Sequence, residues 1–200
     1  MLRLKCEQAR IPMDYYAALM RYARNPDDLT VLAVAGVLAA VVDEGGTERL
    51  PIPGLDAEET HWLLARWFPD AESSLGLYFG APAADSQPGP SYDDIDLVTL
   101  LKTYANPVAG TTTEIQCISH ALACACAGKK HLWQELRLSS RGELSALLEY
   151  WFPALAEKNV HGMKWKKFLY KELCRSEALN VCRASSCGEC AEYSSCFGPE

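Results

Sequence analysis

Four cysteines lie close together near the end of the sequence: Cys182, Cys187, Cys190 and Cys196, in the pattern Cys-x4-Cys-x2-Cys-x5-Cys. Thiolates are soft ligands that suit iron–sulfur clusters and zinc ions. The uncharged side chains between these cysteines are mostly small, so the segment buries too little apolar surface to offset a backbone ordering cost of about 1–2 kcal/mol per residue. Because metal binding contributes free energy of folding to such a segment, we expect a metal to order it.

The spacing of the four cysteines bears on which metal they bind. Structural zinc usually takes two short ligand pairs separated by a longer loop, whereas this segment holds one Cys-x2-Cys pair, Cys187 and Cys190. Its first three cysteines have the Cys-x4-Cys-x2-Cys spacing of plant-type ferredoxins, although the fourth ferredoxin ligand lies farther away. The spacing therefore favours an iron–sulfur cluster over zinc. Two further interpretations stay open: a set of disulfides, and a redox or sulfur-transfer enzyme that uses Cys187 and Cys190 as a reactive pair.

The composition of the chain indicates a folded protein with negative net charge. Of its 200 residues 49% are hydrophobic, and 19 Lys and Arg stand against 26 Asp and Glu, a net charge of −7. This balance argues against a general nucleic-acid binder. The first twenty residues lack the continuous apolar stretch of a secretory signal, and the longest apolar run, 29–42, is too short to cross a bilayer and is expected to form a buried helix. We expect a cytoplasmic protein that binds neither membranes nor nucleic acids.

Apolar residues recur with the helical period along most of the chain, and capping or turn residues separate these segments. The expected helices span 14–24, 28–43, 56–67, 94–104, from a cap at 111 to near 128, 141–150 and about 160–175. The patterns Asp56-x-x-Glu59 and Thr111-x-x-Glu114 can form capping boxes at two of the helix starts. We find no convincing run with the alternation of a β-strand. The sequence therefore predicts an all-α fold.

Two segments interrupt the helical pattern. Residues 80–92 contain three Pro and two Gly with almost no apolar side chain, which indicates a flexible linker between two helical halves. The cysteine-rich segment after the last helix is the second interruption. We expect a compact multi-helix domain over 1–175 and a non-helical, metal-ordered tail over 176–200.

The last expected helix carries two different faces. The apolar side chains on one face are Trp165, Phe168, Leu169 and Leu173. Lys164, Lys167 and Lys171 lie at i, i+3 and i+7 on another face. We expect these charges near the carboxyl end of the helix, where the helix dipole favours cations. Three interpretations of these lysines stay open: an ordinary solvated face, a docking face for an acidic partner, or a positively charged surround of an anionic metal centre. In the last case Lys171 and Arg175 would offset the negative charge of the metal centre.

The end of the chain resembles a known family. The four-cysteine pattern is followed directly by FGPE (197–200). Together they are similar to the carboxyl terminus of the NifQ family of nitrogen-fixation proteins. The stretch HGMKWKKFLYKELC (161–174) resembles the basic helix of that family, and HLWQ (131–134) resembles another of its segments. The similarity is strong over 111–200 and loose over 25–105. The cysteine spacing alone could arise by chance, but its combination with the basic helix and the terminal residues is specific.

The resemblance implies a function. NifQ-like proteins donate molybdenum for the iron–molybdenum cofactor of nitrogenase and carry the metal in a molybdenum–iron–sulfur cluster. It implies that Cys182, Cys187, Cys190 and Cys196 bind an iron–sulfur cluster, of the 3Fe-4S or 4Fe-4S type, which takes up molybdenum from molybdate or another source. The implied partners are the nitrogenase cofactor-assembly scaffold and the nitrogenase iron protein. We expect a carrier and not an enzyme, with a zinc-binding protein-interaction module as the alternative.

Other cysteines and histidines have candidate roles outside the tail. Cys117, His120 and Cys124 share one helical face. They could form a second site for a soft metal, but we favour a place in the hydrophobic core. Cys174 is either a replacement thiol or a buried side chain. His131 either ligates molybdenum or iron, or fixes a turn by hydrogen bonding.

Overall fold

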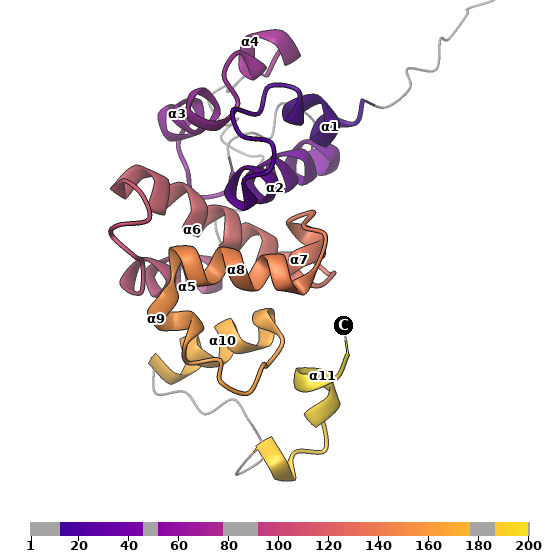
Figure 1. Cartoon of the computed structure of the whole chain (residues 1–200), viewed down its shortest axis with the longest axis vertical. Coiled ribbons are helices and arrows are strands. Elements are labelled where there is room, and N and C mark those ends of the chain that lie inside the picture. The colour runs from indigo at the N-terminus through magenta and orange to yellow at the C-terminus, as the bar shows by residue number, and fades with distance from the viewer. Residues whose placement is uncertain (1–12, 46–51, 78–91, 177–186, 200) are drawn as a thin grey trace, which may run out of the picture.

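The computed structural model describes residues 13–45, 52–77, 92–176 and 187–199 of the chain. Every secondary-structure element in these ranges is a helix, which confirms the all-α fold. The first elements are α1 (Tyr15–Met20), α2 (Leu29–Gly45), α3 (Ala57–Trp67), α4 (Ala71–Leu75), α5 (Tyr92–Thr103) and α6 (Thr112–Ala127). They are followed by α7 (Leu132–Glu135), α8 (Arg141–Trp151), α9 (Pro153–Ala156), α10 (Trp165–Ser176), the 3₁₀-helix η2 (Cys187–Glu189) and α11 (Tyr193–Phe197). In Figure 1, α3 and α4 lie at one end of the long axis, and α10 and α11 lie toward the other.

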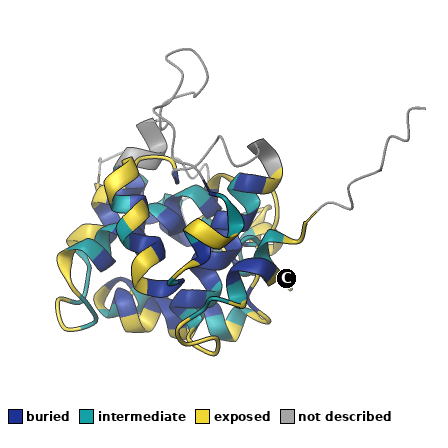
Figure 2. Cartoon of the chain, turned by 90° about the horizontal axis from the view of Figure 1, so that it is seen from above, coloured by how far each residue is buried: buried dark blue, intermediate teal, exposed yellow. Residues whose placement is uncertain are grey.

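Helix α2 lies at the centre of the hydrophobic core. Its buried apolar side chains are Val31, Ala33, Val34, Ala35, Val37, Leu38, Ala39 and Val42. A helix that is apolar on all sides must be covered on all sides, and α2 packs against α1, α6, α7 and α8. Figure 2 shows the buried residues in the interior of the molecule with the exposed ones around them. The buried helix predicted from the apolar run 29–42 is confirmed, and none of the helices in the described ranges is long and apolar enough to span a lipid bilayer.

Gly36 allows α2 to approach the turn that follows α7. A Cβ atom at this position would lie 2.5 Å from the Leu136 carbonyl oxygen, which is closer than any side chain tolerates. The next residue of that turn, Arg137, has a left-handed backbone with a φ of 52°. Its guanidinium group donates a hydrogen bond to Asp43 of α2 at 3.2 Å. The close packing of helix and turn therefore requires glycine at position 36.

Capping boxes begin α3 and α6, as the sequence predicts. The Asp56 carboxylate accepts a hydrogen bond from the Glu59 N–H at 2.8 Å, and the Glu59 carboxylate accepts one from the Asp56 N–H at 2.9 Å. At α6, the Thr111 hydroxyl accepts from the Glu114 N–H at 3.2 Å, and the Glu114 carboxylate accepts from the Thr111 N–H at 2.8 Å. Glu114 also accepts a hydrogen bond from Arg66 of α3 at 2.8 Å. One capping residue thus links two helices.

We expect the Glu114 carboxylate to make stability depend on pH. Burial raises its pKa, but hydrogen bonds from the Thr111 N–H and the Arg66 side chain outweigh burial and hold the pKa below its ordinary value. A carboxyl group whose pKa is depressed by folding adds stability above its unfolded pKa, and this stability is lost as the pH falls through the folded value. The Glu114→Gln variant should lose about 1–3 kcal/mol of unfolding free energy at neutral pH. This deficit should shrink below about pH 4.

Urea unfolding followed from neutral pH to about pH 3 measures this effect. The control is Glu149→Gln, a substitution at an exposed site on α8 that should follow the wild type throughout. A Glu114→Gln deficit that keeps its full size in acid would contradict the depressed pKa.

Two helices are shorter than expected. The structure ends α1 at Met20, where the next three N–H groups bond carbonyl oxygens only three positions back, and the Arg24 N–H then donates to the Trp67 carbonyl oxygen at 3.0 Å. The structure begins α10 at Trp165 rather than near 160. The preceding turn is held by Asn159, whose side chain accepts from the Met163 N–H at 2.8 Å. Side-chain bonding of this kind competes with helix formation.

The tail differs from the expectation in the part that is described. Residues 187–199 contain η2 and α11, so the prediction of a non-helical tail is wrong for this part. The first part of the tail, 177–186, and residues 80–91 of the expected linker lie outside the described residues. The division into a domain over 1–175 and a tail over 176–200 stays a prediction.

Candidate metal centre

Three of the four predicted cysteine ligands lie in the described end of the chain. Cys187 opens η2, Cys190 follows η2, and Cys196 lies in α11, each with its side chain half-buried. The Cys190 N–H donates to the Cys187 carbonyl oxygen at 3.3 Å, and the Tyr193 N–H donates to the Cys190 carbonyl oxygen at 3.1 Å. The fourth ligand, Cys182, lies outside the described residues. We call 187–198 the cysteine segment, and its backbone forms a turn between two short helices.

The cysteine segment contacts α10 at two points. At the amino end of α10, the Lys164 N–H donates to the Cys196 carbonyl oxygen at 2.8 Å, and Lys164 Nζ lies 3.4 Å from the Ser194 carbonyl oxygen. Farther along the helix, Lys171 Nζ lies 3.5 Å from Cys187 Sγ. The cysteine segment and α10 therefore run in opposite directions. Two of the three lysines that the sequence singled out lie against the predicted ligands.

The lysines occupy a different part of α10 from the one expected. Because the helix begins at Trp165, Lys164 and Lys167 lie at its amino end and Lys171 near its middle. The expectation of cations near the carboxyl end is wrong for these three, and the basic residue of the last turn is Arg175. The helix dipole disfavours cations at the amino end, and the first turn of α10 holds no acidic residue. The carbonyl oxygens of the cysteine segment offset this cost for Lys164.

Apolar contacts also hold the described tail. Cys187, Cys196 and Phe197 pack against the hydrophobic core. The rings of Tyr193 and Phe197 stack with their centroids 4.5 Å apart. These two aromatic residues are four positions apart, which places them on one side of a helical turn. The spacing of Tyr193 and Phe197 in the sequence could have indicated α11. Ordering of the tail by a metal stays a prediction.

The donor set suits a thiophilic metal. None of the seven described cysteines forms a disulfide within the described ranges, and thiolates favour iron–sulfur clusters and zinc. The ammonium group of Lys171 supplies positive charge beside Cys187. Within the same ranges, no three Cys, His, Asp or Glu side chains converge as a metal site does. The residues therefore have the chemistry that a thiolate-bound cluster requires. To complete the ligand shell of a metal, the sulfur atoms must move closer together.

Comparison with known proteins shows what the chain is related to. The profile of the NifQ family matches residues 33–198, a range that includes all four cysteines of the motif. The chain belongs to the NifQ family. Membership of the NifQ family places it among proteins that serve nitrogen fixation.

Three curated NifQ relatives give the extent of the similarity. Protein NifQ of Azotobacter vinelandii is 51% identical over 79 residues, which are 40% of each chain. The NifQ homolog of Sinorhizobium fredii is 36% identical over 157 residues, 78% of this chain and 65% of the relative. Protein NifQ of Rhodobacter capsulatus is 31% identical over 169 residues, 75% of this chain and 94% of the relative. The match thus covers less than two thirds of the first two relatives, and no solved structure matches the chain.

In this NifQ-family chain, α6 forms no second metal site with other described residues. The Cys117 side chain is fully buried, and burial together with two nearby carboxylates raises the pKa of its thiol to about 12. A thiol that resists deprotonation is a poor metal ligand at neutral pH. His120 lies against Gly54, where the absence of a Cβ atom leaves room for the imidazole ring, and burial lowers the pKa of His120. Cys124 is half-buried on the same helix.

His131 is the cap residue of α7. Its N–H donates a hydrogen bond to Gln134 Oε1 at 3.1 Å, so the main chain of His131 and the side chain of Gln134 hold the turn. The indole Nε1 of the neighbouring Trp133 is buried and has no hydrogen-bond partner in the described part of the chain. Cys174 is half-buried near the end of α10. Metal ligation by His131 or Cys174 stays a hypothesis.

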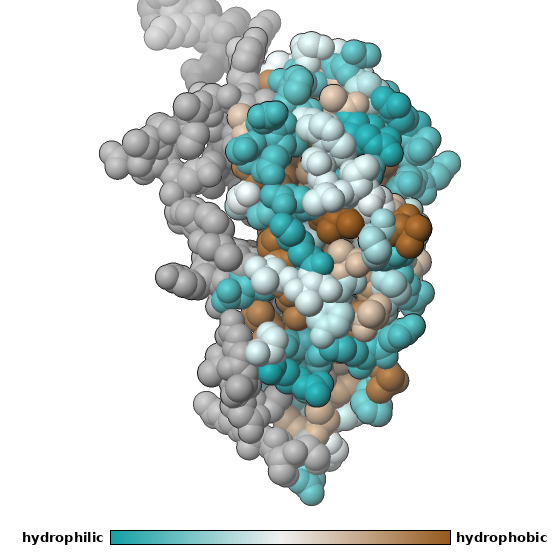
Figure 3. Space-filling view, turned by 90° about the vertical axis from the view of Figure 1, so that its left-hand side faces the viewer, coloured by the Kyte–Doolittle hydropathy of each residue, from teal (hydrophilic) through white to brown (hydrophobic). Residues whose placement is uncertain are grey.

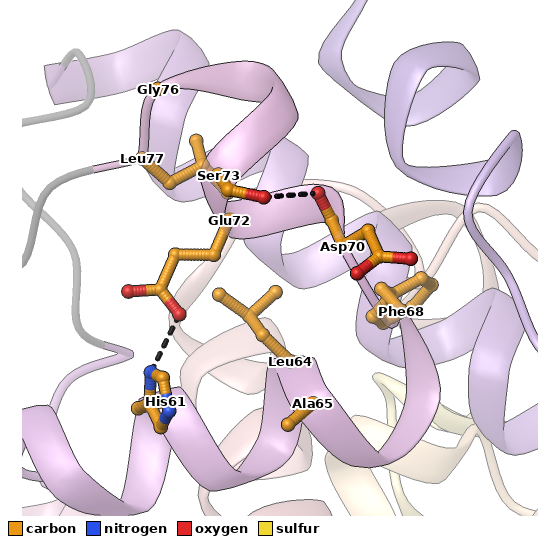
Figure 4. A pocket seen from close by; sticks show the side chains of 9 residues that line it. All are labelled: His61, Leu64, Ala65, Phe68, Asp70, Glu72, Ser73, Gly76 and Leu77. Carbon is orange, nitrogen blue, oxygen red and sulfur yellow. Dashed lines mark hydrogen bonds and ion pairs between the residues drawn. The ribbon is translucent and has the colours of Figure 1, made fainter.

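A pocket of about 450 Å³ lies between α3 and α4 (Figure 4). It is lined by His61, Leu64, Ala65, Phe68, Asp70, Glu72, Ser73, Gly76 and Leu77. His61 Nδ1 and Glu72 Oε2 form a pair at 2.6 Å, with the histidine largely exposed. In Figure 1 these helices lie at the end of the molecule opposite to the cysteine segment. The pocket is therefore separate from the candidate metal centre.

Proposed function

We propose that this chain carries molybdenum in a cluster with iron and sulfur, and that it delivers the molybdenum for assembly of the iron–molybdenum cofactor of nitrogenase. The family match over 33–198 supports the pathway. The observation that supports the site is the contact of Lys171 Nζ with Cys187 Sγ at 3.5 Å, which places a fixed cation beside a predicted thiolate. Clusters with thiolate ligands commonly carry negative charge, which such a cation offsets.

Each residue of the site has a role in this proposal. Cys182, Cys187, Cys190 and Cys196 hold the iron–sulfur part, and this part supplies the position at which the molybdenum cargo is bound. Lys171 stabilises the charged sulfur of Cys187. The three described cysteines are only half-buried, so part of each side chain is accessible to an acceptor. The chain then acts as a carrier without catalytic turnover.

The surface bears on how partners are recognised. On the side of the molecule shown in Figure 3, hydrophobic residues form small separate patches among hydrophilic ones. The most exposed large apolar side chains of the described residues come from different parts of the chain, and they are Met13, Val108, Tyr150, Val160 and Tyr193. Charge complementarity is therefore favoured over apolar burial. The proposed partners are the cofactor-assembly scaffold and the nitrogenase iron protein, with molybdate or another molybdenum source as the supplier.

Anaerobic purification tests the proposal. We expect brown protein with iron and molybdenum bound, and transfer of molybdenum from it to the assembly scaffold, measured as metal recovered with the acceptor. Protein that contains neither iron nor molybdenum, yet still supports nitrogenase maturation, would overturn the proposal.

The two alternative functions give different results in the same preparation. Colourless protein with stoichiometric zinc supports the interaction module, because zinc has no d–d or charge-transfer colour with a filled d shell. Activity that survives removal of all metal supports an enzyme that uses Cys187 and Cys190 as a redox pair.

A further inference from the structure

The loop before α10 is held in one conformation by side chains that the sequence motifs do not include. Asn159 accepts from the Met163 N–H at 2.8 Å and donates to the Met163 carbonyl oxygen at 2.9 Å. Arg141, at the start of α8, donates to the Gly162 and Met163 carbonyl oxygens at 2.7 and 2.9 Å. With its neighbours fixed in this way, the N–H of Lys164 is directed at the Cys196 carbonyl oxygen.

The two lysine contacts hold different parts of the cysteine segment. Lys164 binds main-chain oxygens of α11, so it holds the backbone that carries Cys196. Lys171 contacts a sulfur atom, that of Cys187. The two lysines are seven positions apart, which corresponds to about 10 Å along the helix. Between them Lys167 is exposed and makes no hydrogen bond or ion pair with the described residues.

We propose that the loop 159–164 and α10 form a seat for the cysteine segment, and that Lys164 and Lys171 are positioning residues for the ligands Cys196 and Cys187. The role in metal binding rests on the proposed function, whereas the seat is a property of the metal-free chain. The backbone that carries Cys196 and the sulfur atom of Cys187 contact the helical body before a metal binds. Less ordering entropy then opposes loading of the site.

The contact between Lys171 and Cys187 also affects the loaded site. A group that donates a hydrogen bond to a ligand atom stabilises the ligand's charge and fixes its orientation, and losing such a group usually lowers metal affinity about 10–100-fold. Lys171 is half-buried, and its ammonium group lies 3.5 Å from the sulfur. Methionine retains much of the carbon stem of lysine and lacks the charge.

The rate of iron loss to a chelator from loaded, anaerobic full-length protein tests Lys171. We expect Lys171→Met to lose iron about 10–100-fold faster than the wild type, and Lys171→Arg to restore most of the difference. The matched control is Lys167→Met, which removes a cation from the same face of α10 and should release iron at the wild-type rate. Equal rates for Lys171→Met and Lys167→Met would overturn the positioning role of Lys171.

Hydrogen exchange of the metal-free, reduced chain tests the seat itself. The Lys164→Pro substitution removes the N–H that binds Cys196, and Lys164 directly precedes α10, where proline breaks no hydrogen bond within the helix. We expect loss of exchange protection across 187–198 in Lys164→Pro and retained protection in Lys164→Ala, which keeps the N–H. Wild-type protection of this segment in Lys164→Pro would overturn the seat.

The two measurements separate the inference from the proposed function. If no version of the protein binds iron or molybdenum, the proposed function fails, while the exchange experiment still decides whether the seat exists. If the wild type binds iron but Lys164→Pro and Lys171→Met behave as the wild type does, the seat fails and the proposed function stands. Far-UV circular dichroism confirms that each variant keeps its helices.

Discussion

Replacing Cys190 with serine should remove most of the bound iron and molybdenum while the helical body stays folded. Cys190 lies between η2 and α11, half-buried and outside the hydrophobic core. A serine hydroxyl is a poor ligand for the metals that thiolates favour. Iron bound per chain after anaerobic reconstitution should fall about tenfold or more. The far-UV circular dichroism should be nearly unchanged.

The matched control for Cys190→Ser is Cys124→Ser, which changes a half-buried cysteine of α6 outside the motif. This variant should bind iron and molybdenum as the wild type does. Full iron content in Cys190→Ser would remove Cys190 from the ligand set. A global loss of helical signal would instead place its side chain in the core.

Truncation of Phe152 should have the opposite pattern, a large loss of stability with normal metal binding per folded chain. The Phe152 side chain is fully buried. Its N–H donates to the Leu148 carbonyl oxygen at 2.7 Å, and its own carbonyl oxygen accepts from Leu155 and Ala156 as α9 begins. Removing the ring leaves a cavity at the junction of α8 and α9, so Phe152→Ala should lose about 3–5 kcal/mol of unfolding free energy.

Urea unfolding of the metal-free protein gives the change for Phe152→Ala, and iron per folded chain is measured separately. Val160→Ala, at a side chain that is 76% exposed, is the control and should change the unfolding free energy by less than about 0.5 kcal/mol. If Phe152→Ala bound no iron while still folded, the helical body would be part of the metal site. Together with Cys190→Ser, this pair tests whether folding of the body and metal loading are separable.

The body of the fold could be predicted because its signals are local. Apolar periodicity placed α2, α3, α6 and α8 within a few residues, and the pattern of a cap with Glu three positions later marked the starts at Asp56 and Thr111. The errors arose where other hydrogen bonds replaced the helical ones: a local Asn159 side-chain bond precedes the late start of α10, and a long-range bond follows α1. The Arg24 N–H bonds to the carbonyl oxygen of Trp67, a residue 43 positions away in the sequence, where the expected helix would have continued.

The spacing of the cysteines was enough to locate the cysteine segment in the sequence. It was not enough to predict which residues of the helical body contact this segment. The motif names Cys187, Cys190 and Cys196 as ligands, and the lysine stripe suggested a nearby cation. The pairing of Lys171 with Cys187 and of Lys164 with Cys196 depends on how the chain returns along α10. Arg141 had no signal in the sequence, because its function is to bind carbonyl oxygens of a loop about twenty residues later in the chain.

The bond from the Lys164 N–H to Cys196 has a consequence for how this position tolerates change. The acceptor is the peptide oxygen, which every amino acid possesses, while the thiol extends from the same residue without taking part in that bond. At Cys196 the attachment of the backbone to α10 is therefore independent of metal binding by the side chain. Replacing the thiol at position 196 with an imidazole or a carboxylate would change which metals the site selects. The backbone at this position would still be bonded to the start of α10.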